Sequence, residues 1–478
     1  MAYTTVDKST TSFNSIKYTG NSSAGNITGV GLRPDWTWIK KLTDDAEDHA
    51  AFDSVRGVDT PKLLNPNAQA AVETHGNNGY VSAFISDGFT VATNGSGGDE
   101  WQYLNHSGDT FIAWNWKAGG TAPTKTYTVK VVSDSGNKFR FDDFGTSAVT
   151  LDLQEGGTYT FDTSDSSNGS HPFVLGTSSG VDGSYTTGVT YKLDGVTKTY
   201  SQYTSGYSSA SSRQLIITLA ASAPTLYYNC SSHSGMGGSI NTNSTFGSSN
   251  FAGATQSTVS TNTAAGFSII KYNGTGSQTT IGHELGKKPE WIVIKRLGST
   301  EDWAVYHKAN GAGAYISLNT TEAKNTNNNR FNVAPTSTVF TVNTHESVNY
   351  DEDYIAYCFT SKPGFSAFGA YTGNGNGWGP FTYTGFKPTT LIIKRVQDAG
   401  NQWEIRDNAM DPKNPADDRI FPSSSGVVDA DNEGANLLSN GFKIMNNGGG
   451  CNDNGKRYAY MAFGQSIVGS NNIPATAK

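Results

Sequence analysis

One short stretch of the chain, Leu226 to Gly238, brings together three side chains with metal-binding donor atoms. They are the thiol of Cys230, the imidazole of His233 and the thioether of Met236. The residues before Cys230 alternate as in a β-strand, and the glycines after Met236 are typical of a turn. Soft sulfur ligands combined with imidazole suit copper better than harder metal ions. The stretch therefore predicts a metal site on a loop that ends a strand.

Other residues that could do chemistry form weaker patterns. The sequence has no Gly-x-Ser-x-Gly, P-loop or His-Glu-x-x-His run. The acidic run Asp351–Asp353 could serve a glycosidase or bind Ca²⁺, but adjacent carboxylates in a polar turn are usually solvated. Exposed Trp or Tyr side chains could stack on sugar rings, and sequence does not separate these from core aromatics. We therefore expect no catalytic residues and a protein that is not an enzyme.

Composition favours strands and argues against several classes of partner. Charged residues make up 16% of the 478, while Gly (55), Tyr (23) and Phe (23) are abundant. The net charge is −7 without blocks of like charge, which disfavours binding to nucleic acid. Three cysteines do not make a disulfide framework, which suggests synthesis in a reducing cytosol. Neither a signal peptide nor an apolar run of about 20 residues is visible, so we expect no membrane insertion.

The strongest organisational signal is an internal repeat. Four strand-like blocks recur in the same order three times: an aromatic block ending in Gly, a block opened by Pro, a block with a central aromatic, and a final aromatic block. The first copy has Ser15–Gly20, Pro34–Lys41, Ser86–Val91 and Phe111–Trp116; the second has Ile269–Gly274, Pro289–Arg296, Ser337–Val342 and Tyr354–Phe359; the third has Phe368–Gly373, Pro388–Arg395, Ser439–Ile444 and Tyr458–Phe463. Each copy predicts an antiparallel two-sheet sandwich of jelly-roll or immunoglobulin-like shape.

These boundaries predict an all-β, multidomain chain. We expect the three repeats at 1–120, 266–363 and 364–478, a different β-sandwich at 124–242, and a linker at 243–265 rich in Ser, Thr, Asn and Ala. In the Pro-opened blocks both strand faces carry apolar residues. Such strands are expected to be covered on both sides.

The 124–242 segment resembles the cupredoxins, the blue-copper Greek-key β-sandwiches. The run Leu151–Phe161 is similar to the strand pair that precedes the copper site in that family, and His171 before Pro-Phe-Val is similar to its upstream histidine ligand. The resemblance implies a copper site formed by His171, Cys230, His233 and Met236, with the thioether as a weak axial ligand. Two alternatives stay open: a sandwich of this shape that holds no metal, and zinc, for which a thioether is a poor ligand.

The outer repeats resemble repeat proteins encoded by tailed phages of marine bacteria. The run Phe52–Gly57 and the recurring blocks carry this resemblance. It implies lectin-like, concanavalin-type sandwiches and a cupredoxin-like module in a structural protein of the virion, assembled in the host cytoplasm. The implied function is a tail fibre or appendage that contacts a host glycan or receptor, docks to other virion proteins and forms a homo-oligomer. The alternatives are a capsid decoration or head-fibre protein, a copper redox protein, and a depolymerase.

Overall fold

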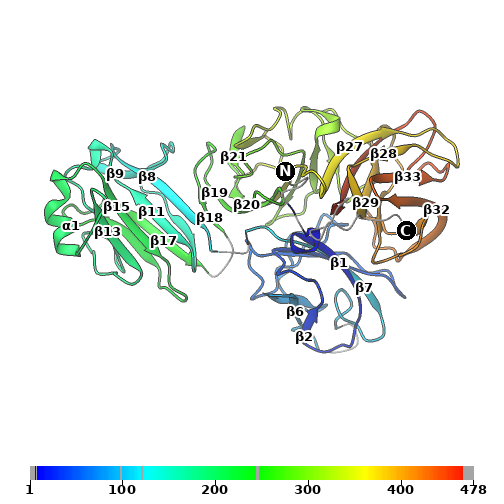
Figure 1. Ribbon diagram of the computed structural model, residues 1–478, viewed down its shortest axis with the longest axis horizontal. Helices are drawn as coiled ribbons and strands as arrows, with labels where there is room; N and C mark the ends of the chain where they lie inside the picture. The colour runs from blue at the N-terminus through cyan, green and yellow to red at the C-terminus, as the bar shows by residue number, and fades with distance from the viewer. Residues whose placement is uncertain (1–5, 7, 97–99, 120–121, 244–246, 467–478) are drawn as a thin grey trace. The chain divides into compact units, whose positions relative to one another are not determined.

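The computed structural model describes residues 6, 8–96, 100–119, 122–243 and 247–466. Nearly all of the regular secondary structure in the described residues is β-strand (Figure 1), which confirms the predicted all-β class. It divides into two compact units. The first unit combines residues 1–118 with 261–478, and the second comprises residues 119–260. Within the described residues, the one α-helix is α1 (Tyr200–Gly206), and no helix is long and apolar enough to cross a membrane.

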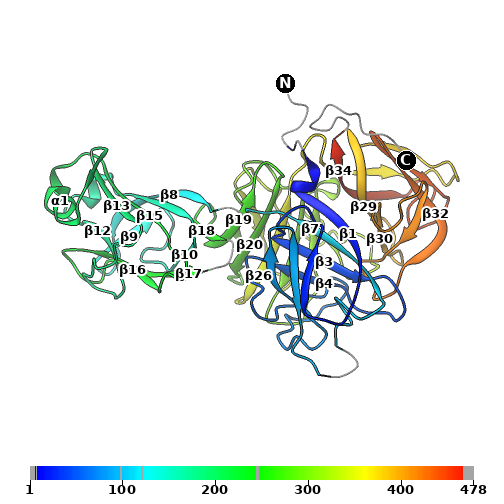
Figure 2. The same ribbon diagram turned by 60° about the horizontal axis from the view of Figure 1, so that its bottom comes forward.

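Each repeat of the first unit contributes one main sheet with a common strand order. In repeat 1 the order is β1-β7-β3-β4, and Figure 2 shows these four strands side by side. Repeat 2 has β20-β26-β22-β23, extended by β24, and repeat 3 has β27-β34-β29-β30. The bounds are β1 (Phe13–Thr19), β3 (Trp36–Lys41), β4 (Ala50–Asp53), β7 (Thr110–Trp116), β20 (Phe267–Asn273), β22 (Trp291–Arg296), β23 (Ala304–His307), β24 (Ile316–Ser317), β26 (Asp353–Phe359), β27 (Ser366–Thr372), β29 (Phe386–Arg395), β30 (Trp403–Asp407) and β34 (Arg457–Ser466).

A second sheet in each repeat completes a sandwich. The strand orders are β2-β6-β5 in repeat 1, β21-β25 in repeat 2 and β28-β33-β32-β31 in repeat 3. The bounds are β2 (Gly25–Thr28), β5 (Tyr80–Ile85), β6 (Gly88–Ala92), β21 (Thr279–Gly282), β25 (Val339–Val342), β28 (Phe381–Tyr383), β31 (Ala416–Arg419), β32 (Asp429–Leu438) and β33 (Gly441–Met445). The repeat found in the sequence is therefore a repeat of strand order.

The Pro-opened strands are covered on both faces, as their pattern predicted. All six residues of β3 and of β22 are buried. In β3, Ile39 packs inside the sandwich of repeat 1, while Trp36 and Trp38 pack in a single hydrophobic core to which all three repeats contribute. Trp291 and Val293 of β22 belong to the same shared core. Apolar residues on both faces of such a strand therefore indicate that each face packs in a different hydrophobic core.

The shared core is organised around three equivalent aromatic side chains. Trp116, Phe359 and Phe463 stand opposite corresponding residues near the ends of β7, β26 and β34. Their ring centroids lie 6.3 Å apart for Trp116 and Phe359, 5.7 Å for Trp116 and Phe463, and 5.6 Å for Phe359 and Phe463. Three equivalent residues in mutual contact define a pseudo-threefold axis within the first unit.

Hydrogen bonds join the three repeats in a cyclic order. The last residues of β4, β23 and β30 occupy equivalent positions, and each bonds to the next repeat. The three bonds run from Tyr357 OH to Asp53 Oδ2 (2.8 Å), from His307 Nε2–H to Tyr460 O (3.2 Å) and from Trp114 Nε1–H to Asp407 Oδ2 (3.0 Å). Repeat 1 bonds to repeat 2, repeat 2 to repeat 3, and repeat 3 to repeat 1. The three sandwiches form a closed ring.

Three equivalent lysines are buried within this ring. Lys40, Lys295 and Lys394 are fully buried. The Nζ of Lys40 donates to Glu47 O (2.8 Å) in its own repeat and to Ser425 O (3.0 Å) in repeat 3. Lys295 likewise donates to carbonyl oxygens of repeats 2 and 1. Burial lowers the pKa of each of the three lysines to about 8.

The second unit is a different two-sheet sandwich with mixed sheets. The strand orders are β10-β17-β16-β12 and β14-β13-β15-β11-β8-β9, with parallel pairing in β10–β17 and β8–β11. The bounds are β8 (Thr124–Ser133), β9 (Asn137–Phe141), β10 (Leu151–Gln154), β11 (Thr158–Asp162), β12 (Phe173–Gly176), β13 (Val189–Leu193), β14 (Val196–Lys198), β15 (Arg213–Thr218), β16 (Leu226–Cys230) and β17 (Gly238–Asn243). Its core is rich in Phe and Tyr, which pack in stacked and edge-to-face pairs.

Part of the stretch expected as a linker is folded. Residues Ser248–Asn250 form β18, which pairs antiparallel with β19 (Ser257–Asn262). Within the second unit, Tyr127 OH donates to Ser249 O (2.9 Å) and Phe251 packs into the aromatic core. The polar composition of this stretch did not indicate strands, because its serines and asparagines make their buried contacts through backbone atoms and small hydroxyl groups.

Candidate metal centre

Strand pairing brings the predicted ligands to one end of the second unit. Cys230 is the last residue of β16 and stands opposite Phe173, the first residue of β12. His171 precedes β12 by two residues, and Ser231 N–H donates to Pro172 O (3.0 Å). The antiparallel register therefore places the residues just before β12 beside those just after β16. A histidine and a cysteine 59 residues apart in sequence become neighbours in this way.

Three of the four predicted ligands converge. The Nδ1 atoms of His171 and His233 lie 3.1 Å apart, and Cys230 Sγ lies 3.5 Å from His233 Nδ1 and 3.9 Å from His171 Nδ1. With metal–nitrogen bonds of about 2.0–2.1 Å and metal–sulfur bonds of about 2.3 Å, donors that share one ion lie roughly 3–4 Å apart. The spacing of the three donor atoms fits a single metal ion.

The fourth predicted residue lies in the same loop and is buried. Met236 belongs to the aromatic core of the unit, and its carbonyl oxygen accepts a hydrogen bond from Phe139 N–H (2.9 Å). His233 is exposed, whereas Cys230 and His171 are buried. The site thus has a buried sulfur side and one imidazole that faces solvent.

Glycine shapes the loop that carries His233 and Met236. A Cβ on Gly237 would lie 1.6 Å from Tyr228 O, so no other residue fits where the chain turns back along β16. Gly235 has φ +74°, a left-handed conformation that favours glycine. The Nζ of Lys138 donates to Gly235 O and ties the loop to β9. The seven residues between β16 and β17 are held by these contacts.

Burial favours the neutral forms of His171 and Cys230. Burial lowers the pKa of His171, and the neighbouring His233 lowers it further; both effects favour the neutral imidazole, the form that binds metals. Burial raises the pKa of the Cys230 thiol, although backbone hydrogen bonds from Ser232 and His233 oppose the rise. A metal ion would displace that proton on binding, as metal–thiolate formation requires.

The structure adds one neighbour that the sequence did not indicate. Asn137 Nδ2 lies 3.4 Å from His171 Nε2, the ring nitrogen that faces away from the cluster. Such a contact fixes the orientation of a ligating imidazole. Asn137 stands at the start of β9, and nothing in the local pattern distinguishes it from other turn asparagines.

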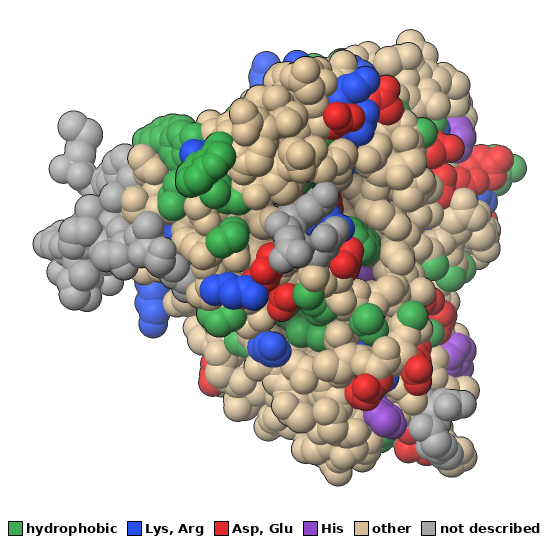
Figure 3. All heavy atoms as spheres, turned by 90° about the vertical axis from the view of Figure 1, so that its right-hand side faces the viewer, with side chains coloured by type: hydrophobic (Ala, Val, Ile, Leu, Met, Phe, Trp, Pro, Cys, Tyr) green, Lys and Arg blue, Asp and Glu red, His purple; other side chains and the backbone are tan. Residues whose placement is uncertain are grey.

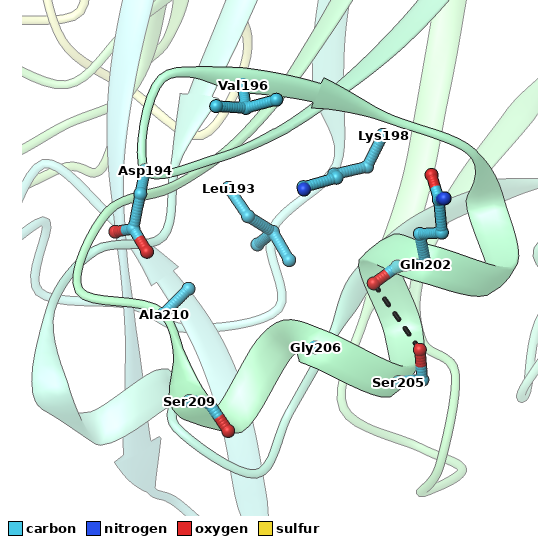
Figure 4. A pocket seen from close by; sticks show the side chains of 9 residues that line it. All are labelled: Leu193, Asp194, Val196, Lys198, Gln202, Ser205, Gly206, Ser209 and Ala210. Atoms are coloured by element: carbon cyan, nitrogen blue, oxygen red, sulfur yellow. Dashed lines mark hydrogen bonds between the residues drawn. The ribbon is translucent and has the colours of Figure 1, made fainter.

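A separate pocket of about 490 Å³ lies elsewhere in the second unit (Figure 4). It is formed by the β13–β14 hairpin, α1 and the residues that follow. In Figure 4 the side chains of Leu193 and Lys198 point toward its middle, and Gly206 lies on the helix at its edge. None of the four predicted ligands lines this pocket, so it is distinct from the candidate metal centre.

Comparison with known proteins assigns a family but no activity. No curated protein and no solved structure matches the chain. A family described as "Domain of unknown function (DUF7483)" matches residues 8–151 and 228–466. The match includes Cys230, His233 and Met236, and it omits the stretch that holds His171 and the pocket. Because the matched residues make up most of the chain, the protein belongs to the DUF7483 family.

Proposed function

We propose that this chain is a structural protein of a phage virion, a fibre or appendage that contacts the host surface. The observation that carries the proposal is the closed ring of three sandwiches. Residues that could do chemistry, such as Asp53, His307 and Asp407, are used to join one repeat to the next. The resemblance of the repeats to virion proteins of marine phages supports the same role.

A ring of packed repeats suits a part that must stay rigid while it is exposed on a particle. Contacts with a host envelope can then be individually weak, because many copies on one particle multiply them. The same body could instead decorate a capsid without contacting a receptor. Position on the particle separates these two roles.

The direct test is to locate the protein on the particle. Antibodies raised against the purified chain would be applied to virions from the phage that encodes it and imaged by electron microscopy. Labelling at the tail or its appendages is the expected result. Labelling over the capsid would favour decoration, and unlabelled virions that also lack the protein by mass spectrometry would refute a virion role.

We propose, as a second property, that the second unit binds one copper ion. Two imidazole nitrogens and one cysteine sulfur, all within 4.8 Å of one another, favour this over a purely structural sandwich. His171, Cys230 and His233 would hold the ion, with Met236 from the same loop. Bound copper would supply one-electron redox chemistry, while the buried Cys230 side keeps water from the sulfur.

Copper binding can be tested without any activity assay. Addition of Cu²⁺ to the purified chain should give one equivalent of bound metal and a strong visible absorption from copper–thiolate charge transfer. Cys230→Ser should abolish the absorption, whereas Cys358→Ser, which removes a buried thiol of the first unit, should leave it unchanged. Metal analysis that finds zinc alone, or no metal after copper addition, would refute the proposal.

A further inference from the structure

Repeat 3 carries a group of exposed aromatic side chains at an edge strand. Trp378 is 71% exposed, Phe381 48% and Tyr383 61%. Phe381 and Tyr383 are alternate residues of β28, the edge strand of its sheet, and therefore point to the same side. Figure 3 shows hydrophobic side chains gathered on a face of the molecule, with Lys or Arg side chains beside them. We call Trp378, Phe381 and Tyr383 the aromatic strip.

Trp378 differs from every other tryptophan of the chain. The remaining eight are 5% exposed or less: Trp36, Trp38, Trp101, Trp114, Trp116, Trp291, Trp303 and Trp403. Leaving a large side chain in water forgoes about 2 kcal/mol or more of burial free energy. The fold therefore gains little from an indole at this position, and a ligand that covers the ring would recover the difference.

The loop that presents Trp378 is ordered by its own hydrogen bonds. Trp378 N–H donates to Asn376 Oδ1 (3.2 Å), and Asn374 Nδ2 donates to Trp378 O (3.3 Å). Asn452 Nδ2 donates to Asn376 O (2.8 Å), which ties the loop to the body of the repeat. The Nζ of Lys443 lies 4.9 Å from the centre of the indole ring. A ring held in this way loses little freedom when a ligand binds.

The sister repeats show that the strip is not needed for the sandwich. Strand pairing puts Asn26 and Thr28 of β2 at the positions that Phe381 and Tyr383 occupy in β28. The corresponding strand of repeat 2 has Thr280–Gly282, with small residues at both outer positions. The same fold thus forms with small residues there. The aromatic side chains are specific to repeat 3.

We propose that the aromatic strip binds an oligosaccharide of a cell surface through stacking of its pyranose rings. The apolar C–H faces of sugar rings pack on aromatic rings, and the surrounding polar side chains, Asn374, Asn376 and Lys443, can bond to hydroxyl groups. The strip offers on the order of 300–400 Å² of aromatic surface. A stable protein interface buries about 800 Å² on each partner, so a short glycan fits the strip better than a protein.

Trp378 itself provides the assay. Iodide in solution quenches the fluorescence of exposed indoles only, so it should quench Trp378 and leave the eight buried tryptophans bright. Soluble gluco-, manno- and galacto-configured hexaoses would be added to the full chain. At least one series is expected to protect the quenchable emission, and Trp378→Phe should remove that emission altogether. Iodide quenching that no hexaose reduces would overturn the proposal.

A variant built from the sister repeat tests the rest of the strip. Phe381→Asn with Tyr383→Thr installs the residues of repeat 1, so the fold should persist, and hexaose binding should weaken at least tenfold. Tyr350→Ala is the matched control, because Tyr350 is 50% exposed in repeat 2 with the Arg296 guanidinium 5.0 Å from its ring, yet lies outside the strip. Equal loss of binding in this control would overturn the assignment.

The inference rests on the proposed host contact for its choice of a cell-surface glycan, and the two can fail separately. A chain that is found on virions but binds no hexaose leaves the virion role intact and refutes the strip. A chain that binds hexaoses but is absent from virions refutes the virion role and leaves glycan binding by the aromatic strip intact. Loss of particle assembly in the Phe381→Asn, Tyr383→Thr variant, without any hexaose binding by the parent chain, would assign the strip to a virion protein instead.

Discussion

The indole Nε1–H of Trp114 donates a 3.0 Å hydrogen bond to the carboxylate of Asp407, 293 residues further along the chain. The same carboxylate accepts from Ser15 Oγ (2.9 Å) and Ala409 N–H (2.7 Å). Asp407 is fully buried, and burial raises the pKa of its carboxyl although these hydrogen bonds oppose the rise. One side chain thus joins repeat 3 to repeat 1.

Removal of this carboxylate should weaken the ring. Asp407→Ala leaves the buried Trp114 donor and the half-buried Ser15 donor without this partner, and we expect the free energy of unfolding of the first unit to fall by about 2–4 kcal/mol. Denaturant unfolding followed by near-ultraviolet circular dichroism measures the loss. Asp59→Ala, in an exposed ion pair with Lys62, is the control and should change stability by less than about 0.5 kcal/mol. A loss equal to that of the control would show that the bond is dispensable.

His307 should make the ring sensitive to acid. Its Nδ1 accepts from Ala309 N–H (3.2 Å), so Nε2 carries the proton that bonds to Tyr460 O, and burial lowers its pKa to about 4. Above pH 6.5 the imidazole is neutral in both states and contributes no pH dependence. From pH 6.5 down to about 4 only the unfolded chain takes up the proton, so stability should fall by up to about 3 kcal/mol.

The measurement is the free energy of unfolding from pH 7 to pH 4.5 for the wild-type chain and for His307→Gln. The glutamine can still donate to Tyr460 O, but it does not titrate. The free energy of unfolding of the wild-type chain, relative to that of His307→Gln, should fall as the pH drops below 6.5 and should be constant above it. A constant difference across the range would contradict the assignment.

The buried lysines should act at the opposite end of the pH scale. Between pH 8 and about 10 the unfolded chain retains protons on Lys40, Lys295 and Lys394 that the folded sites have released. Stability should therefore rise with pH in this window, by up to about 1.4 kcal/mol per pH unit for each lysine. Lys295→Met should reduce that slope in denaturant titrations. An unchanged slope would show that Lys295 stays protonated in the folded protein.

The trend should reverse above about pH 10. Burial raises the pKa of Tyr354 to about 12, so the unfolded chain then loses a proton that the folded protein keeps. Stability falls with pH in that range. The predicted maximum of the free energy of unfolding near pH 10 distinguishes the effect of the buried lysines from a general loss of stability in alkali.

The loop of the candidate metal centre should tolerate one glycine change and not another. Gly237→Ala places a Cβ against Tyr228 O, and we expect the second unit to lose about 3–5 kcal/mol of stability and its copper absorption. Gly235→Ala meets no atom within 4 Å, so it should cost about 1 kcal/mol, from its positive φ alone. Thermal unfolding and metal titration of the two variants measure the contrast. Equal effects would mean that the loop opens freely.

Sequence alone predicted the strands better than it predicted their partners. The recurring order of four blocks predicted three sandwiches correctly, because strand periodicity and turn residues are local signals in the sequence. The closed ring could not be predicted, since nothing around Trp114 or Asp407 marks residues 293 positions apart as neighbours. The role of His307 depends on a carbonyl oxygen of another repeat, which no local sequence pattern marks.

The candidate metal centre was more accessible to prediction than the aromatic strip. Cys230, His233 and Met236 share one loop, so their spacing carries the chemistry, and His171 followed from a resemblance. Trp378 could not be separated from the core tryptophans, because exposure depends on the loop geometry set by Asn374 and Asn376. Donor atoms are visible in a sequence, whereas solvent exposure is a property of the folded chain.

The insertion of the second unit between repeats 1 and 2 has a consequence for synthesis on the ribosome. Trp36 stacks on Tyr357 at 4.3 Å between ring centroids, and the two residues are separated by the whole of the second unit. At roughly 5–20 residues per second, translation delivers Tyr357 about 16–64 seconds after Trp36. During that interval the nascent chain holds the indoles of repeat 1 without their final partners. Early capture by a chaperone, or by repeat 1 of a neighbouring nascent chain, competes with closure of the ring.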